Sequence, residues 1–254
     1  MDNVSGFMID MDGTVYKGKN VIKGAPEFIE RLKEKKIPFV FLTNNSASDR
    51  EHYYNKLTKM GFKISIDNIL TSTTATVSYI QKHHSGETVY PLGTSKFVKE
   101  IKEAGICIDD ERPDIVLLAF DTSVTYEKMN NAYQFLKKGS KFIATHPDDL
   151  CPTEDGYDID IGPFIRFFES MTGKKATVIG KPNEIMVKMA AERMGVTLKD
   201  MVMVGDRVYT DMKMASDAGI RSIMVLSGEA KRSDAAKAGV RPTLIVDSVD
   251  DILR

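Results

Sequence analysis

Two aspartates near the start of the chain, Asp10 and Asp12, have a spacing that can support chemistry. They lie in the stretch Asp10-Met11-Asp12-Gly13-Thr14, directly after the apolar run Phe7–Ile9. Side chains two residues apart on a regular strand point to the same face, and Gly13 allows the backbone to turn sharply there. Carboxylates this close repel each other, so a divalent cation or a shared proton must stabilise them. The alternative interpretation is a strand-to-turn junction in which the aspartates serve local hydrogen bonding.

Two further segments follow apolar runs and carry groups suited to an oxyanion. Thr43-Asn44-Asn45-Ser46 offers hydroxyl, amide and backbone N–H groups after the run Pro38–Leu42, at the strand end where such sites form. Lys181, in Gly180-Lys181-Pro182-Asn183, offers a cation between the run Ala176–Ile179 and a helical pattern. Taken singly, the first segment is also typical of a turn or helix cap, and the lysine of a solvated loop.

A fourth segment, Gly205-Asp206-Arg207-Val208-Tyr209-Thr210-Asp211, follows the run Met201–Val204 and again combines glycine with acids. Asp206 is expected at the strand tip, and Asp211 can reach back from the first turn of the next helix. An acid is favoured at a helix start in any case. All four segments nevertheless stand at predicted strand ends, the edge where open α/β sheets bind ligands. The sequence therefore predicts that they form one site.

The elements that must position these residues alternate short apolar runs with helical patterns, which predicts parallel βαβ units in a doubly wound α/β fold. The runs are continuous, as in strands covered on both faces. Outside the middle of the chain, the expected strands are Gly6–Ile9, Pro38–Leu42, Met201–Val204, Ser222–Leu226 and Leu244–Val246, with helices over Pro26–Lys36 and Asp211–Ala218. In the middle, the expected strands are Thr88–Pro91, Ile115–Phe120 and Phe142–Thr145, with helices over Ser95–Ala104, Tyr126–Lys138 and Pro163–Thr172. The Pro/Gly/Asp-rich stretch His146–Gly162 predicts a loop.

Composition narrows the class of protein. Lys and Arg number 35 against 36 Asp and Glu in 254 residues, which argues against a binder of nucleic acid polymers but not against a small anionic substrate. Cys107 and Cys151 are far apart and suggest neither a disulfide framework nor a zinc site. No signal peptide and no apolar run of about 20 residues is visible. We expect a soluble, cytoplasmic protein without a membrane partner.

These motifs, in this order, resemble the haloacid dehalogenase (HAD) superfamily over almost the whole chain. The segments Leu42-Thr43-Asn44-Asn45, Gly180-Lys181-Pro182 and Gly205-Asp206-Arg207 look closest to its NagD-like, 4-nitrophenylphosphatase-like branch. The resemblance implies a Rossmann-like core with an α/β cap domain inserted between the second and third motifs. The stretch from Thr14 to Thr43 is too short for a domain, so residues 84–175 are expected to form the cap, and residues 1–83 and 176–254 the core.

The resemblance implies a Mg²⁺-dependent phosphatase that acts on small phosphorylated metabolites through an aspartyl-phosphate. Asp10 would be the nucleophile and a metal ligand. Asp12 would protonate the leaving oxygen, activate water, and ligate the metal through its backbone carbonyl. Asp206 would be the remaining protein ligand of the metal, with Asp211 supporting it.

The resemblance also implies that Thr43, the Asn44 backbone and Lys181 hold the phosphoryl oxygens. This assignment is physically coherent, because an attacking carboxylate and a phosphate dianion repel each other. At ~4 Å and an effective dielectric constant of ~20, each pair of unit charges interacts by about 4 kcal/mol. Mg²⁺ and Lys181 would supply compensating positive charge.

One departure from the pattern lies in the predicted cap. His146, in Thr145-His146-Pro147-Asp148-Asp149, stands where many relatives carry Asn. We interpret His146, Asp148 and Asp149 as a substrate-specificity loop, with a second metal site there as the alternative.

Three other functions fit parts of the pattern: a phosphomutase on the same core, a phospho-signalling receiver, and a non-catalytic binding protein. A receiver would lack Asp-x-Asp-Gly-Thr after the first strand, and a mutase of this superfamily usually carries its cap between the first two motifs. The resemblance leaves the substrate open among sugar phosphates, nucleotides and other phosphoesters. A homodimer through the cap is compatible with it.

Overall fold

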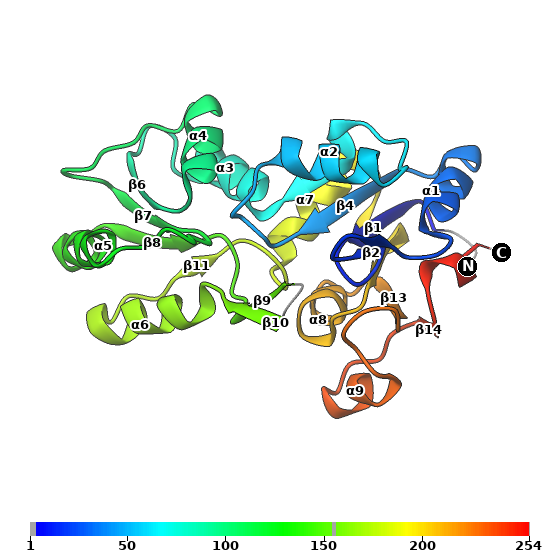
Figure 1. The fold of residues 1–254 in the computed structure, drawn as a ribbon. Coiled ribbons are helices and arrows are strands. Elements are labelled where there is room, and N and C mark those ends of the chain that lie inside the picture. The colour runs from blue at the N-terminus through cyan, green and yellow to red at the C-terminus, as the bar shows by residue number, and fades with distance from the viewer. Residues whose placement is uncertain (1–3, 154–155, 254) are drawn as a thin grey trace. The chain divides into compact units, whose positions relative to one another are not determined.

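The computed structural model describes residues 4–153 and 156–253, which form two compact units (Figure 1). The first, here called the core unit, contains Met1–Thr43, Arg50–Leu70 and Lys181–Arg254. The second, the inserted unit, contains Asn44–Asp49 and Thr71–Gly180. The predicted cap, residues 84–175, lies within the inserted unit, which also includes helix α3 (Ser72–His83). Its role as a cap stays a prediction.

A six-stranded sheet forms the centre of the core unit. Its strand order is β14-β13-β12-β1-β4-β5, and β1 pairs in parallel with both β12 and β4. The strands span Gly6–Asp10 (β1), Phe39–Thr43 (β4), Ile69–Thr71 (β5), Met201–Gly205 (β12), Arg221–Val225 (β13) and Leu244–Val246 (β14). Every residue of β1 and β12 is buried, as the continuous apolar runs predicted. The carboxyl ends of β1, β4 and β12, which carry three of the four motifs, are therefore adjacent.

Helices and small elements complete the core unit. The helices are α1 (Ala25–Glu34), α2 (Arg50–Lys59), α7 (Glu184–Met194), α8 (Lys213–Asp217) and α9 (Arg232–Lys237). A two-stranded hairpin, β2 (Tyr16–Lys17) and β3 (Asn20–Val21), follows the first motif, and 3₁₀ turns lie at Ile66–Asn68, Leu198–Asp200 and Val249–Asp251. Helix α1 buries Phe28, Ile29 and Leu32 on one face, each worth about 1.5–3 kcal/mol of stabilisation when fully buried.

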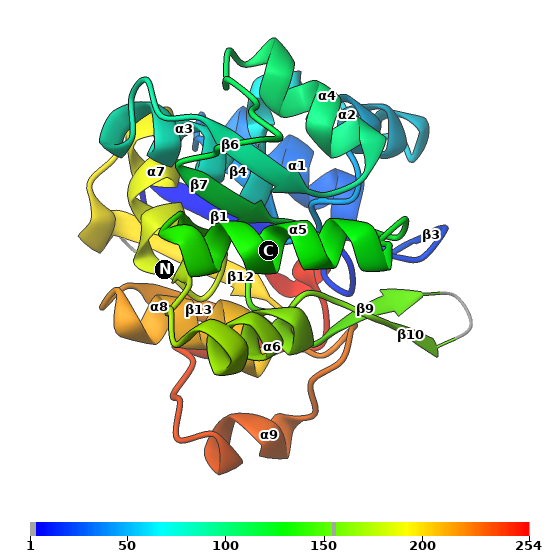
Figure 2. The ribbon, with the colours of Figure 1, turned by 90° about the vertical axis from the view of Figure 1, so that its left-hand side faces the viewer.

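The inserted unit has its own parallel sheet, with strand order β11-β8-β7-β6. Its strands are β6 (Val89–Leu92), β7 (Ile115–Leu118), β8 (Lys141–Ala144) and β11 (Thr177–Val178), and its further helices are α4 (Ser95–Glu103), α5 (Tyr126–Lys138) and α6 (Gly162–Thr172). Helices α5 and α6 cover one face of this sheet, and α3 and α4 lie on the other (Figure 2). The hydroxyls of Thr94 and Thr125 cap α4 and α5 by accepting from Phe97 N and Lys128 N, which fixes where each helix begins.

The loop predicted for His146–Gly162 is wrong in part. Strands β9 (Leu150–Thr153) and β10 (Gly156–Ile159) form an antiparallel hairpin there, and residues 154–155 of the predicted loop lie outside the described residues. The strands pair only with each other and are mostly exposed, so they lack the buried apolar pattern from which strands are predicted. Pro152 is tolerated because this is an edge strand.

Within the described ranges, no helix is long and apolar enough to cross a membrane.

Candidate active site

Asp10 and Lys181 form a buried ion pair at the end of β1. Lys181 Nζ donates to Asp10 Oδ1 and, over 2.7 Å, to Asp211 Oδ1. Lys181 is 3% exposed. Burial alone would lower the pKa of this lysine, but the charges of Asp10 and Asp211 outweigh it and raise the pKa above its ordinary value. Lys181 is therefore a fixed cation beside the predicted nucleophile, and not a solvated loop lysine.

A π-helical turn, Val208–Met212, brings Asp211 to this lysine. Met212 N donates to Arg207 O over 3.2 Å, five residues back, and Arg207 N donates to Asp211 Oδ2 over 3.1 Å. The predicted helix over Asp211–Ala218 thus begins as this turn and continues as α8. Turns of this kind are frequent at functional sites, because the extra residue re-aims a side chain.

Asp206 follows β12 and is held by protein donors on both carboxylate oxygens. Thr14 Oγ1 donates to Oδ1 over 3.3 Å, and Glu229 N donates to Oδ2 over 2.7 Å. Burial first, and then the charges of Asp10 and Asp211, raise the pKa of Asp206 to about 8. Burial likewise raises the pKa of Asp211, against the lowering effect of Lys181.

Two glycines make room for the Asp206 carboxylate. A Cβ on Gly13 would come 2.3 Å from Asp206 Oδ2, and a Cβ on Gly228 would come 1.9 Å from the same atom. Gly13 also has a φ of 88°, which favours glycine. The segment Ser227–Glu229 was not anticipated from the sequence, although it follows β13 and so stands at another strand end. Ser227 Oγ also donates to Gly13 O over 2.7 Å.

Asp12 lies beside this group in a different environment. Asp12 is half-buried, and its backbone forms an isolated β-bridge with Tyr16 in the turn of the first motif. Burial raises the pKa of Asp12; nearby Lys56 opposes the shift and Asp10 adds to it. Lys56 lies 3.8 Å above the ring of Tyr16. A carboxyl with a raised pKa beside a second carboxyl that pairs with a lysine is the pattern of a proton donor beside a nucleophile.

Among the described residues, ligand oxygens of Asp10, Asp206 and Asp211 lie within 4.8 Å of one another. When all three carboxylates are ionised, they leave two negative charges beyond the ammonium of Lys181, and a divalent cation would neutralise these charges. An all-oxygen donor set with this excess of charge fits Mg²⁺. The Asp12 carboxylate is not part of this group, and a ligand role for its backbone carbonyl stays a prediction.

Thr43 and Asn44, the predicted phosphate binders of the second motif, lie on either side of the division between the units. Thr43 ends β4 in the core unit, and Asn44 begins the first segment of the inserted unit. Asn44 is buried. Its carbonyl accepts from Ser72 Oγ over 2.6 Å, and its Nδ2 donates to the two Asp148 oxygens over 3.1 and 3.2 Å.

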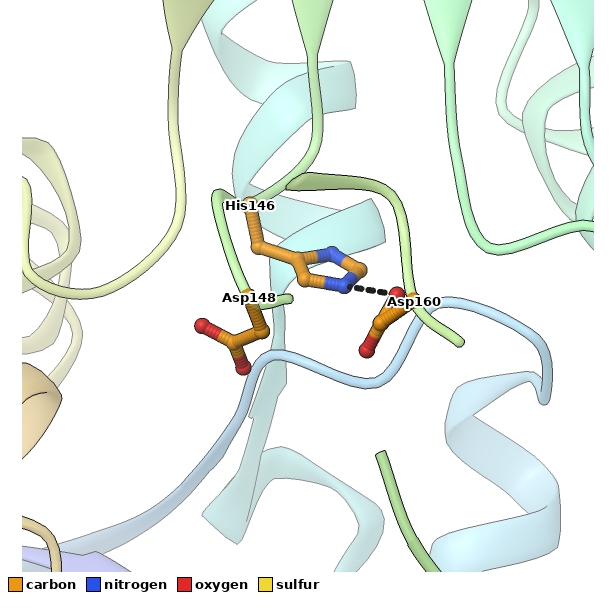
Figure 3. Close-up of side chains that lie close together, drawn as sticks. All are labelled: His146, Asp148 and Asp160. Carbon is orange, nitrogen blue, oxygen red and sulfur yellow. Dashed lines mark hydrogen bonds and ion pairs between the residues drawn. The ribbon is translucent and has the colours of Figure 1, made fainter. Parts of the chain in front are cut away.

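Within the inserted unit, the predicted specificity residues separate into two groups. His146 is fully buried, with Nε2 2.8 Å from Asp160 Oδ1 and Nδ1 2.9 Å from Thr145 Oγ1, and Asp148 lies beside it (Figure 3). Asp149 is exposed and pairs with Arg166 over 2.7 Å. Any influence of His146 on specificity is therefore indirect. Asp160 was missed, because it stands in the stretch predicted as a loop and no motif marks it.

Comparison with known proteins identifies the family. Residues 7–107 match the family model described as haloacid dehalogenase-like hydrolase, and residues 178–252 match a second model described as HAD-hydrolase-like. The chain belongs to the haloacid dehalogenase-like hydrolase family. The two matched segments contain all four motifs of this HAD hydrolase, so the resemblance inferred from them is confirmed.

Similar proteins cover the whole length of this HAD hydrolase. A 4-nitrophenylphosphatase structure from Thermotoga maritima is 40% identical, with a TM-score of 0.94 over 98% of this chain and 96% of its own. Escherichia coli NagD is 28% identical, with a TM-score of 0.92 and 98% of each chain covered. Among sequence relatives, the acid sugar phosphatase of Staphylococcus saprophyticus is 34% identical over 255 residues, covering 100% of this chain and 98% of the relative. These likenesses place the chain in the NagD-like branch and confirm the α/β fold.

Proposed function

We propose that this HAD hydrolase is a Mg²⁺-dependent phosphomonoester hydrolase that works through an aspartyl-phosphate on Asp10. The names of its relatives, which include a 4-nitrophenylphosphatase, an acid sugar phosphatase and the 5'-nucleotidase YutF of Bacillus subtilis at 31% identity over 251 residues, support the phosphatase class. The single observation that carries the mechanism is the buried group of Asp10, Asp206 and Asp211 around one lysine. This group has an excess of negative charge that a bound divalent cation would neutralise, and the cation would then allow a phosphate to approach.

The chemistry assigned to the aspartates follows from their environments. An Asp10 oxygen forms a bond to phosphorus while the bond from phosphorus to the substrate oxygen breaks. Asp12, whose raised pKa keeps a proton available, gives that proton to the departing oxygen. Asp12 then takes a proton from a water that attacks the phosphorus, which releases inorganic phosphate and restores Asp10. The two roles of Asp12 match general acid and base catalysis by a positioned carboxyl, and the role of Asp10 is nucleophilic catalysis.

The binding groups neutralise charge without changing covalently. Lys181 pairs with Asp10 and would hold a phosphoryl oxygen, in a buried setting where one charge counts for more than in water. Thr43 and the backbone N–H of Asn44 supply further donors to the phosphoryl group. Asp211 positions Lys181 through their 2.7 Å contact.

A magnesium ion would be held by the Asp10 carboxylate, the Asp12 carbonyl and the Asp206 carboxylate. When bound, it would neutralise the carboxylates and the phosphate oxygens so that they can approach one another. Thr14 and Glu229 N orient Asp206 for this role.

The substrate class is a small phosphorylated metabolite, because the relatives are named for sugar phosphates, nucleotides and a nitrophenyl ester. The inserted unit is the candidate specificity domain, with His146, Asp148 and Asp149 as its proposed residues. A homodimer through this unit and a cytoplasmic location stay predictions from the sequence.

Phosphate release tests the proposal and separates it from its main alternative. The purified chain, with Mg²⁺, is assayed against sugar phosphates, nucleotides and 4-nitrophenyl phosphate, and phosphate release is compared with substrate loss. A hydrolase gives equal rates of the two. Substrate loss without phosphate release would indicate a phosphomutase, and no turnover of any substrate by the wild type would contradict the proposal.

A further inference from the structure

The chain passes between its two units at four places, and two of them carry predicted phosphate-binding residues. One crossing is Thr43 to Asn44, and another is Gly180 to Lys181. On the side of the inserted unit these two crossings touch. A Cβ added to Gly180 would come 2.6 Å from Asn44 Oδ1, so only glycine fits there. The residues next to Thr43 and Lys181 in the chain are therefore packed against each other.

A short loop after β8, residues 145–148, holds both crossings. Gly180 N donates to Thr145 O over 2.8 Å. On the other crossing, Asn44 Nδ2 donates to the Asp148 carboxylate, and Ser46 Oγ lies 3.1 Å from Thr145 Oγ1. The position of this loop thus sets the positions of Asn44 and Gly180 together.

A buried chain of hydrogen bonds fixes the loop, and its donors can be assigned. The amide of Phe120 can only donate, so Ser46 Oγ accepts from it over 2.9 Å. Ser46 then donates to Thr145 Oγ1, and Thr145 donates to His146 Nδ1, so that each hydroxyl accepts once and donates once. If His146 Nδ1 carried a proton, it would donate to Thr145, and Thr145 would then donate to Ser46. The buried hydroxyl proton of Ser46 would have no acceptor within this chain of hydrogen bonds.

Asp160 ends this chain. His146 Nε2 carries the proton and donates it to Asp160 Oδ1 over 2.8 Å, and the same oxygen accepts from Ile161 N over 2.8 Å at the start of α6 (Figure 3). Asp160 is 2% exposed and His146 is fully buried. The carboxylate therefore selects the tautomer of His146 that the hydroxyls of Thr145 and Ser46 require.

We propose that Asp160 is a positioning residue: through His146 and Thr145 it fixes, within the inserted unit, the predicted phosphate-binding residue Asn44 and Gly180, which precedes Lys181 in the chain. This inference rests on the proposed function. It differs from a specificity role, because a misplaced phosphate-binding group impairs all phosphate esters equally. It also differs from a second metal site at His146, Asp148 and Asp160, because here Asp160 acts as a hydrogen-bond acceptor and its charge is not required.

Substitutions at the two ends of the hydrogen-bond chain test the proposal in the full-length protein with Mg²⁺. Asp160→Ala removes the acceptor, Asp160→Asn keeps an oxygen that can accept the same two bonds, and Thr145→Val breaks the chain next to His146 with little change of volume. Asp114→Ala is the matched control: Asp114 accepts from Thr88 N and Oγ1 before β7 in the same unit. For each variant, kcat and KM for 4-nitrophenyl phosphate, competitive inhibition by inorganic phosphate and the melting temperature are measured.

We expect Asp160→Ala and Thr145→Val to lower kcat/KM about ten- to a hundredfold, the scale of a small misplacement of binding groups, and to weaken inhibition by inorganic phosphate as well. Asp160→Asn and Asp114→Ala should stay near the wild type. Wild-type kinetics in a folded Asp160→Ala variant would overturn the proposal, and if that variant does not fold, Thr145→Val decides by the same criterion. An equal loss in Asp160→Asn and Asp160→Ala would overturn it in favour of a bound cation. If the wild-type protein is active while the variants contradict the positioning role, the proposed function still stands. An inactive wild-type protein would defeat both the positioning role and the proposed function.

Discussion

Lys181 Nζ lies 2.7 Å from Asp211 Oδ1, and neither side chain is more than 3% exposed. This contact joins the first residue of the core unit after a chain crossing to a π-helical turn that follows β12. The same ammonium also reaches Asp10. One buried cation therefore organises two of the four motifs.

Lys181→Ala should lower kcat/KM at least a hundredfold, because it removes the cation nearest the predicted nucleophile. It should also destabilise the metal-free protein by about 3–5 kcal/mol, since it leaves buried carboxylates without their partner. Lys188→Ala is the control, because Lys188 forms an exposed pair with Glu184 on the same helix, α7. Steady-state kinetics and urea unfolding of both variants check the prediction, and equal behaviour of the two would return Lys181 to the status of an ordinary lysine.

Asp10→Asn should fold normally and lose essentially all activity, because an amide does not form the acyl-phosphate. General acid and base help alone accounts for factors of only ~10²–10⁴. Retention of more than about a hundredth of the wild-type kcat would therefore remove Asp10 from the role of nucleophile. Trapping of labelled phosphate on the wild-type protein during turnover, and its loss in the variant, is the direct measurement.

Removal of the metal should abolish activity reversibly, and the stability of the metal-free protein should depend on pH through Asp206. The pKa of this group is raised from 3.8 to about 8, so its contribution to stability is complete below pH 3.8 and is lost as the pH rises through about 8. Magnesium should thus raise the melting temperature more at about pH 8 than at about pH 6, because the metal replaces the proton.

Asp206→Asn is the matching variant. At a pH above about 8, where Asp206 is ionised, the substitution should stabilise the metal-free protein by removing a buried like charge. It should also abolish the magnesium-dependent rise in melting temperature. Full activity in excess chelator, or an unchanged response of Asp206→Asn to magnesium, would contradict the metal assignment.

Asp149→Ala should change substrate preference, if the exposed residues of the predicted specificity loop read the leaving group. Its pair with Arg166 is exposed, so the free energy of unfolding should change by less than about 1 kcal/mol. Relative to 4-nitrophenyl phosphate, kcat/KM for the best natural substrate should shift by about 1–3 kcal/mol, the scale of one pocket contact. An equal fall for both substrates would mean that Asp149 serves folding and not selection.

The sequence predicted the parts of the site that stand at buried strand ends. Asp10 and Asp206 follow runs in which every residue is apolar enough to be covered on both faces, and parallel pairing of β1 with β12 then brings them together. Such predictions succeed because a strand that is buried on both faces needs apolar residues throughout, and a single sequence shows such a run.

Other features left no comparable trace. Asp160 acts through a hydrogen bond to His146 across an intervening hairpin, and either residue alone resembles a loop residue. The π-helical turn that aims Asp211 depends on two backbone bonds that span five residues, Met212 N to Arg207 O and Lys213 N to Val208 O, which many residue types can make. Hydrogen bonds that depend on where segments lie in the folded chain, and not on the periodicity of the sequence, have to be seen in the structure.

The fourfold crossing of the chain has a practical consequence for transplantation of the inserted unit between relatives. A graft of residues 71–180 alone would separate Thr145 from its native partner Ser46, and Asp148 from its native partner Asn44, because Asn44–Asp49 belongs to the same compact unit. A chimaera that exchanges both segments keeps these contacts native to one parent. The unit that can be exchanged is therefore discontinuous in sequence, and its smaller piece is the six-residue segment that follows β4.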